Sequence, residues 1–184
     1  MKIIETTFQG LLIIEPSVFQ DERGYFFESF QKKRYRDAGI YSDFVQDNES
    51  KSNRGVIRGL HYQLNPHAQA KLVRVIQGTV YDVALDLRKN SPTFGEYFGI
   101  ELSETNKLQL FIPRGFAHGF SVLSESAIFK YKCDNYYLGD LDRSINVFDP
   151  KLNIDWKLND FKSIVSAKDQ QAPFFDEAEI NFVI

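Results

Sequence analysis

The sequence predicts an all-β fold, either a sandwich or a jelly-roll barrel. Three observations favour it. Short runs rich in β-branched and aromatic residues recur along the chain, turn residues separate them, and a single segment has the composition of a helix. Many short strands at regular spacing are typical of sandwiches and jelly rolls.

The expected elements follow in chain order. A strand at 11–15 ends at Pro16, and the next follows the turn-like residues 21–24. Residues 31–38 are polar, lack β-branched side chains and precede Gly39, which predicts one short helix. The expected strands are 11–15, 25–30, 71–77, 79–87, 97–102, 108–112, 119–123 and 127–133, with a polar turn at 88–92.

Length and composition indicate one folded domain over residues 1–184. Typical domains have roughly 100–200 residues, and the chain has 184. No repeat, low-complexity tract or Pro/Ser/Gly-rich linker divides it. Hydrophobic residues make up 43% and aromatic residues 15%, which is enough for a core and excludes general disorder.

Charge and cysteine content exclude several classes of protein. The formal net charge is −3 and the Lys and Arg residues are scattered, so neither a nucleic-acid surface nor a membrane-binding face is expected. Cys133 is the one cysteine, so no internal disulfide or thiolate metal cluster can form. The first ten residues carry Glu5, Thr6 and Thr7 where a signal peptide needs apolar residues. No run approaches the ~20 apolar residues of a membrane span, and a cytoplasmic protein is expected.

Two polar side chains fall on apolar strand faces. In a strand, alternate residues share a face. Lys71 therefore lies with Val73 and Val75, and Tyr131 lies with Phe129. This pattern predicts a lysine and a tyrosine near the barrel interior.

The three histidines do not form a metal-binding pattern. Residues 113–118 have the Pro-x-Gly-x-x-His spacing typical of cupin barrels, ending at His118. The matching first segment would need His-x-His, but it reads His61-Tyr62-Gln63, and an amide replaces one expected ligand. We therefore expect no metal; an iron- or manganese-dependent cupin is the less favoured alternative. The third histidine, His67, fits neither motif.

A metal-free group of His, Lys and Tyr side chains suits proton transfer at carbon. A histidine can remove a proton next to a ketone. A lysine ammonium then stabilises the enolate oxygen, and a tyrosine can return a proton to the opposite face. A carboxylate such as Asp169 can orient the imidazole. Each residue alone also fits a structural role, so a non-catalytic module that binds sugars or nucleotides is a second alternative.

Eight segments, in order, resemble one family, the dTDP-4-dehydrorhamnose 3,5-epimerases of deoxysugar biosynthesis. The resemblance extends from about residue 3 to about residue 175. The segments are Asp-Glu-Arg-Gly-Tyr-Phe-Phe-Glu at 21–28, Phe-Val-Gln-Asp-Asn at 44–48, Ile-Arg-Gly-Leu-His-Tyr-Gln at 57–63, Lys-Leu-Val-Arg at 71–74, and those at 86–94, 112–120, 131–137 and 166–169.

The resemblance implies a cupin-type jelly roll with a few short peripheral helices, in a homodimer that exchanges an N-terminal strand. It implies inversion of C3 and C5 of dTDP-4-dehydro-6-deoxy-D-glucose, without a cofactor. By resemblance His61 is the base, Asp169 its carboxylate partner, Lys71 the enolate-stabilising cation and Tyr131 the proton donor. An epimerase acting on one carbon, C3 or C5, of a related nucleotide 4-ketosugar is the close rival.

By the same resemblance, a further set of residues contacts the nucleotide sugar, and two of them, Arg23 and Glu28, serve the partner's site. The set is Arg23, Glu28, Gln46, Asp47, Asn48, Arg58, His118, Tyr137 and Lys168. Arg58 and His61 can line one pocket only if the chain bulges or the strand ends near Gly59. Residues 138–144 depart from the family pattern, and Asp142 lies about where the family has a Glu.

Overall fold

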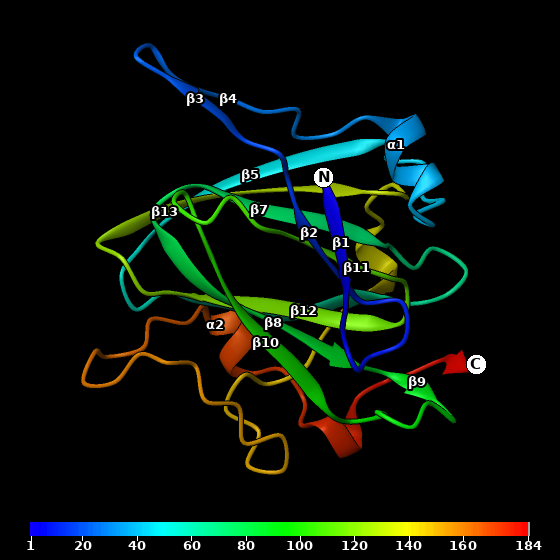
Figure 1. The fold of residues 1–184 in the computed structure, drawn as a ribbon. Helices are drawn as coiled ribbons and strands as arrows, with labels where there is room; N and C mark the ends of the chain where they lie inside the picture. The colour runs from blue at the N-terminus through cyan, green and yellow to red at the C-terminus, as the bar shows by residue number, and fades with distance from the viewer. Residues whose placement is uncertain (184) are drawn as a thin grey trace.

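The computed structural model describes residues 1–183, which form two facing β-sheets with short helices at the periphery (Figure 1). The strands are β1 (Lys2–Glu5), β2 (Leu12–Glu15), β3 (Phe19–Asp21), β4 (Gly24–Phe26), β5 (Gln46–Asn53), β6 (Ile57–Gln63), β7 (Lys71–Gln77), β8 (Thr79–Asp86), β9 (Arg88–Lys89), β10 (Tyr97–Ser103), β11 (Gln109–Ile112), β12 (Phe116–Val122), β13 (Ser126–Cys133), β14 (Asp142–Ser144) and β15 (Phe182–Val183). The helices are α1 (Lys32–Asp37), α2 (Ala167–Gln170) and the 3₁₀ turns η1 (Gly139–Leu141) and η2 (Phe175–Glu177). The all-β prediction is confirmed.

One sheet has six strands in the order β1-β2-β11-β7-β13-β5, and the other has five in the order β10-β8-β12-β6-β14. Neighbouring strands within both sheets are antiparallel. Two small pairs lie outside them, the hairpin β3–β4 and the parallel pair β9–β15. None of the helices within residues 1–183 is long and apolar enough to cross a lipid bilayer.

The hydrophobic core has three layers. Side chains of both sheets meet between them, as with Val73 of β7 and Ala84 of β8. The outer face of the six-stranded sheet is covered by α1, which buries Tyr35. The outer face of the five-stranded sheet is covered by the C-terminal segment, which buries Trp156 and Phe175 (Figure 1).

Strand alternation places polar groups between the two sheets, as predicted. Val73 and Val75 of β7 and Phe129 of β13 are buried between the sheets, and Tyr131 packs against the same cluster. Lys71 therefore projects to the interior along with the two valines. The expected positions of Lys71 and Tyr131 are confirmed.

Some local predictions differ from the structure. The strand expected at 25–30 ends at Phe26, because the chain leaves the hairpin there to begin the approach to α1. Strand β5 was not expected, since it has no hydrophobic residue in its eight positions. It forms the edge of the six-stranded sheet, where polar side chains face water and pairing with β13 supplies the backbone bonds. The expected turn at 88–92 contains the two-residue strand β9.

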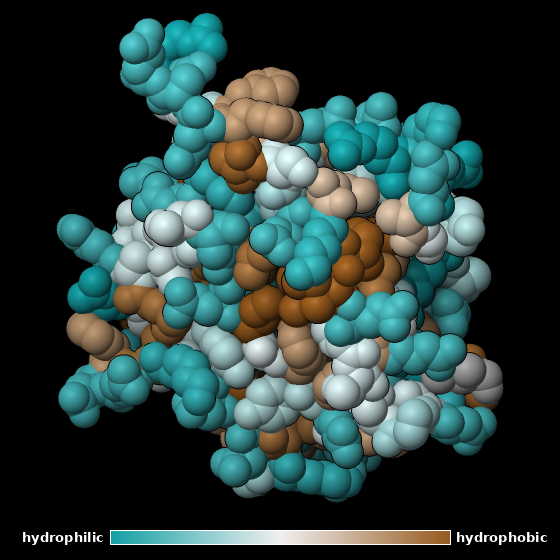
Figure 2. All heavy atoms as spheres, in the orientation of Figure 1, coloured by the Kyte–Doolittle hydropathy of each residue, from teal (hydrophilic) through white to brown (hydrophobic). Residues whose placement is uncertain are grey.

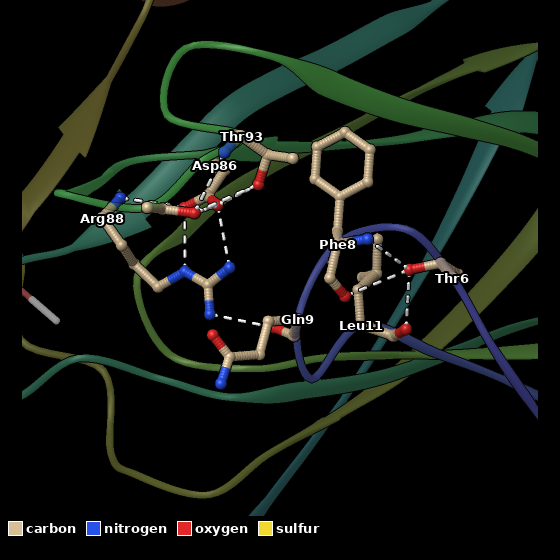
Figure 3. Close-up of polar contacts among 8 residues, drawn as sticks. Thr6, Phe8, Gln9, Leu11, Asp86, Arg88 and Thr93 are labelled. Atoms are coloured by element: carbon tan, nitrogen blue, oxygen red, sulfur yellow. Dashed lines mark hydrogen bonds and ion pairs between the residues drawn. The ribbon is translucent and has the colours of Figure 1, made fainter.

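An ionic cluster around the buried Asp86 joins the segment 86–93 to the turn between β1 and β2 (Figure 3). Arg88 donates to both carboxylate oxygens of Asp86 at 2.8 Å, and Ser91 and Thr93 donate to Asp86 Oδ2 at 2.6 and 2.7 Å. Arg88 also donates to the carbonyl oxygen of Gln9 at 2.9 Å, which fastens the turn between β1 and β2. Burial raises the pKa of Asp86, but these hydrogen bonds outweigh it and hold the pKa below its ordinary value.

We expect Asp86→Ala to lower the free energy of unfolding by about 3 kcal/mol, because it leaves Arg88 buried without its counterion. Since the folded-state pKa of Asp86 is depressed, its stabilisation is present above the unfolded pKa and is lost as pH falls through the folded value. Urea unfolding at pH 7 measures the loss. Asp155→Ala, which removes an exposed carboxylate bonded to Lys157, is the control and should not shift the midpoint. An equal effect of the two substitutions would contradict the argument.

Candidate active site

A cavity of about 320 Å³ opens between the two sheets. Its volume is within the range of pockets that bind small molecules. Strands β5, β7 and β13 of one sheet and β6 and β12 of the other provide its walls. The lining residues are Asn48, Glu49, Ser50, Arg58, His61, Lys71, His118, Phe120, Phe129 and Tyr131.

His61 is paired with a buried carboxylate. Its Nε2 lies 2.7 Å from Oδ1 of Asp169, which is 4% exposed. Asp169 lies in α2, whose N-cap Ser166 accepts a hydrogen bond from the Asp169 N–H at 3.1 Å. Burial raises the pKa of Asp169, but hydrogen bonds from His61, Ser166 and the Gly59 backbone outweigh it and keep the pKa below its ordinary value. An ionised carboxylate here orients the ring and stabilises an imidazolium.

A bulge in β6 brings Arg58 and His61 to the same cavity. The pairs His118–His61 and Phe120–Arg58 are two residues apart in β12 but three apart in β6, so β6 has one extra residue between them. Gly59 has a φ of 138°, and a Cβ there would lie 2.6 Å from the Cα of Gly119. Only glycine fits this conformation and this approach. The expected bulge near Gly59 is confirmed.

Lys71 and Tyr131 face His61 from the opposite sheet. Lys71 Nζ lies 3.4 Å from the carbonyl oxygen of His61 and 5.9 Å from the ring centroid of Tyr131. Burial lowers the pKa of Lys71, partly offset by Cys133, Asp142 and Asp82. Burial raises the pKa of Tyr131, so the phenol keeps its proton at neutral pH. A base on one wall and a phenol and a cation on the other suit proton transfer at a carbon held between them.

His118 belongs to a second, deeper histidine–carboxylate pair. Its Nε2 lies 2.9 Å from Oδ2 of Asp82, which is fully buried. Burial lowers the pKa of His118, although Asp82 opposes the shift. The sequence analysis overlooked Asp82. The argument applied to Lys71 would have found it, because Asp82 shares an apolar strand face with Val80 and Ala84.

Three polar residues outside the cavity lining, Tyr137, Asp142 and Lys168, form a connected group. Lys168 Nζ lies 2.6 Å from Oδ2 of Asp142, and the Tyr137 hydroxyl lies 3.5 Å from the same oxygen. Asp142 is two residues from Ser144, the residue paired with His61 across β14 and β6. The structure thus brings Tyr137, Lys168 and Asp142 together beside His61.

The consecutive residues 46–48 divide between the two faces of β5. Asn48 lines the cavity, and Gln46 donates to the Asn48 side chain at 3.2 Å. Asp47 points to the other face, where it pairs with Lys132 at 2.8 Å and Lys130 at 3.4 Å. Both lysines line a separate hollow on the outside of the sheet. The structure therefore does not bring Asp47 to the cavity.

Arg23 and Glu28 also lie away from the cavity of their own chain. Arg23 is at the end of the β3–β4 hairpin, which projects from the body, and it pairs with Asp21 at 2.5 Å (Figure 1). Glu28 follows the hairpin and pairs with Arg34 at 2.9 Å. Neither residue is among those that line the cavity.

Within residues 1–183, no three His, Cys, Asp or Glu side chains are grouped as metal ligands. The Nε2 atoms of His61 and His118 are each bonded to a carboxylate. The side chain of Gln63, which stands at the expected ligand position, is hydrogen-bonded to loop backbone instead.

Comparison with known proteins places this site in context. The sequence model of a family described as dTDP-4-dehydrorhamnose 3,5-epimerase matches residues 5–177. The dTDP-4-dehydrorhamnose 3,5-epimerase of Shigella flexneri is 51% identical over 180 residues, covering 97% of this chain and 98% of the relative. The crystal structure of the enzyme of that name from Elizabethkingia anophelis NUHP1 has 54% identity and a TM-score of 0.91, covering 96% and 97% of the two chains. A dTDP-6-deoxy-D-glucose-3,5-epimerase from Legionella pneumophila Philadelphia 1, solved with dTDP-4-keto-L-rhamnose, has 51% identity and a TM-score of 0.92, covering 96% and 93%.

The pairing of His61 with Asp169 can be tested by titration. We expect His61→Ala to raise the pKa of Asp169, because burial then acts with less opposition. The ionised carboxylate stabilises the fold above its unfolded pKa, and this is lost as pH falls through the depressed folded pKa, so the variant should also unfold at higher pH during acidification. Carboxyl ¹³C NMR against pH measures the shift, with His67→Ala as control. An unchanged Asp169 titration in His61→Ala would refute the coupling.

Proposed function

The chain belongs to the dTDP-4-dehydrorhamnose 3,5-epimerase family, and from this premise we propose how its cavity inverts C3 and C5 of dTDP-4-dehydro-6-deoxy-D-glucose to give dTDP-4-dehydro-L-rhamnose. The observation that carries the proposal is the His61–Asp169 pair on one wall, facing Lys71 and Tyr131 on the other. A sugar ring held between these walls has both faces within reach of a proton-transferring group. One domain over residues 1–184 then carries out the whole reaction without a cofactor.

The first step is removal of a proton next to the ketone. The Nε2–H of His61 donates a hydrogen bond to the Asp169 carboxylate and keeps its proton, which leaves the unprotonated Nδ1 as the base; Nδ1 has no hydrogen-bond partner among residues 1–183. The C–H bond at C3 or C5 breaks, its proton passes to Nδ1, and its electron pair moves onto the C4 oxygen as an enolate. Asp169 stabilises the resulting imidazolium.

The second step stabilises the enolate and reprotonates it from the other side. Lys71 lies on the opposite wall, and its ammonium form suits the negative enolate oxygen. Tyr131, protonated because burial raises its pKa, donates its hydroxyl proton to the carbon on the face opposite His61. The carbon is thereby inverted. His61 loses its proton and Tyr131 regains one from solvent before the second carbon reacts.

The substrate-binding roles follow the positions of the remaining residues. Arg58, Asn48 and His118 line the cavity and suit sugar hydroxyls and the first phosphate. Lys168 and Tyr137, outside the cavity lining, suit the diphosphate and the nucleobase. Gln46 supports Asn48. Asp47, on the outer face, has no such role in its own chain's cavity.

The proposal includes a homodimer in which the β3–β4 hairpin reaches the partner's cavity. The hairpin projects from the body and exposes Phe19, Tyr25 and Phe26 at 66%, 54% and 71% (Figure 1). Hydrophobic atoms gather at its foot, whereas its tip is hydrophilic (Figure 2). A partner surface would cover these rings and would bring Arg23 and Glu28 to a second cavity. A cytoplasmic location is also part of the proposal, and it agrees with a single, buried, free thiol at Cys133.

The reaction is tested with dTDP-4-keto-6-deoxyglucose in deuterium oxide, following C3 and C5 by NMR. We expect deuterium at both carbons. His61→Ala should slow the exchange by about 10²–10⁴-fold, because the base is lost. Tyr131→Phe should still exchange protons on the His61 face but should not invert, because the opposite donor is lost. His67→Ala, outside the cavity, should behave as the unmodified protein.

Each other result has a definite meaning. Deuterium at one carbon only identifies a single-centre epimerase. Exchange that needs added iron or manganese identifies a metal-dependent cupin. Binding without exchange identifies a non-catalytic module, and full activity in His61→Ala excludes this histidine as the base.

The exchanged hairpin is tested by subunit complementation. Arg23→Ala and His61→Ala are each expected to have low activity as pure dimers. A mixed dimer has one intact site, with His61 from one chain and Arg23 from the other. Random reassociation makes half the dimers mixed, so about one quarter of the sites should recover. Sedimentation should give twice 21.3 kDa. No recovery, with Arg23→Ala alone inactive, would show that Arg23 acts in its own chain.

A further inference from the structure

Gln63 is a buried polar residue that the proposed mechanism does not use. It lies at the end of β6, two residues after His61, and is 3% exposed. A buried amide is costly unless its donors and acceptor are all bonded. The partners of this amide therefore indicate what it holds in place.

The side-chain amide of Gln63 forms hydrogen bonds with the backbone on both sides of Tyr137. The Leu138 N–H donates to Gln63 Oε1 at 2.8 Å, and Gln63 Nε2 donates to the carbonyl oxygen of Tyr136 at 3.1 Å. Nε2 donates a second hydrogen bond to the carbonyl oxygen of His67, so both N–H groups and the oxygen of the amide have partners.

A second glutamine holds Tyr137 itself. The Tyr137 N–H donates to Gln46 Oε1 at 3.1 Å. Hydrogen bonds from two strands thus fasten the backbone before, at and after this residue. The side chain behaves differently: Tyr137 is 57% exposed, and its hydroxyl group lies 3.5 Å from Oδ2 of Asp142. Asp142 is the residue paired with Gln63 across β14 and β6.

We propose that Gln63 is a positioning residue that presents the ring of Tyr137 as a preformed stacking platform for the base of the nucleoside diphosphate. This inference rests on the proposed function. Bases stack on exposed aromatic rings, and a ring on a loop that must first be ordered binds more weakly, because ordering the loop opposes binding. Three hydrogen bonds to the two peptide groups that flank the Tyr137 Cα reduce that loss beforehand.

The chemistry of the anchor requires an amide. A carboxylate at position 63 accepts from Leu138 but has no proton for the carbonyl oxygens of Tyr136 and His67. A thioether of similar length replaces none of the three hydrogen bonds. Gln63→Glu therefore keeps one of the three hydrogen bonds and Gln63→Met keeps none, while the side-chain volume stays nearly constant.

Gln69 provides a matched control. Its Nε2 donates to the carbonyl oxygen of Asn135 at 2.8 Å, so it anchors the same loop, but two residues before Tyr137 and through one bond. Gln69→Met removes a glutamine anchor without releasing either neighbour of Tyr137.

The experiment measures dTDP binding by calorimetry, together with kcat and KM, for these variants. We expect Gln63→Met to weaken dTDP binding about tenfold, the loss expected for one stacked base, and to raise KM with kcat nearly unchanged. Gln63→Glu should lie between Gln63→Met and the unmodified protein, and Gln69→Met should bind normally. If the loop had a purely structural role, the Gln63 and Gln69 variants would show equal losses of kcat and of thermal stability. That result would overturn the proposal.

A double-mutant cycle with Tyr137→Ala tests whether Gln63 affects dTDP binding through the Tyr137 ring. If Gln63 acts through the ring, Gln63→Glu should weaken dTDP binding no further once the ring is absent. Additive losses would overturn the inference while leaving the proposed function intact. Failure of the unmodified protein to bind dTDP would instead count against the proposed function.

Discussion

The arrangement of the site depends on the close approach of β6 and β12 at Gly59 and Gly119. Because neither residue has a Cβ, β6 can carry one extra residue there without leaving the sheet. The bulge turns Arg58 and His61 to the same side, and the Gly59 backbone also hydrogen-bonds to Asp169. One irregularity in the β6–β12 ladder thus positions His61, Asp169 and Arg58.

Burial shifts the pKa of several ionisable groups at the cavity, but its effect depends on the partners. Lys71 and His118 have lowered pKa values and Tyr131 a raised one, so burial favours the neutral form of each. Asp169 is the exception, because three hydrogen bonds to the carboxylate exceed the effect of burial. The His61 wall therefore keeps a negative charge beside its base, whereas the opposite wall keeps a phenol ready to donate.

Much of the fold could be predicted because alternate residues of β7, β8 and β13 share one face. On that face, apolar residues of each strand are buried between the sheets. The same reasoning placed Lys71 and Tyr131 inside and required either a bulge or a strand end near Gly59. The sequence reasoning overlooked β5, because its residues are all polar and show no hydrophobic alternation. This strand is formed through its backbone hydrogen bonds to β13. The sequence reasoning also overlooked Asp82. Pairings between distant segments, such as Asp82 with His118, depend on sheet order, which local patterns do not encode.

The two walls of the cavity belong to different sheets, and an aromatic stack joins them. Phe120 of β12 and Phe129 of β13 lie with ring centroids 4.2 Å apart and planes 19° apart, beside His118. Protein interiors are densely packed and resist compression. The two stacked rings therefore hold the wall that carries His61 at a fixed distance from the wall that carries Tyr131. In this barrel the core acts as a spacer for the cavity beside it.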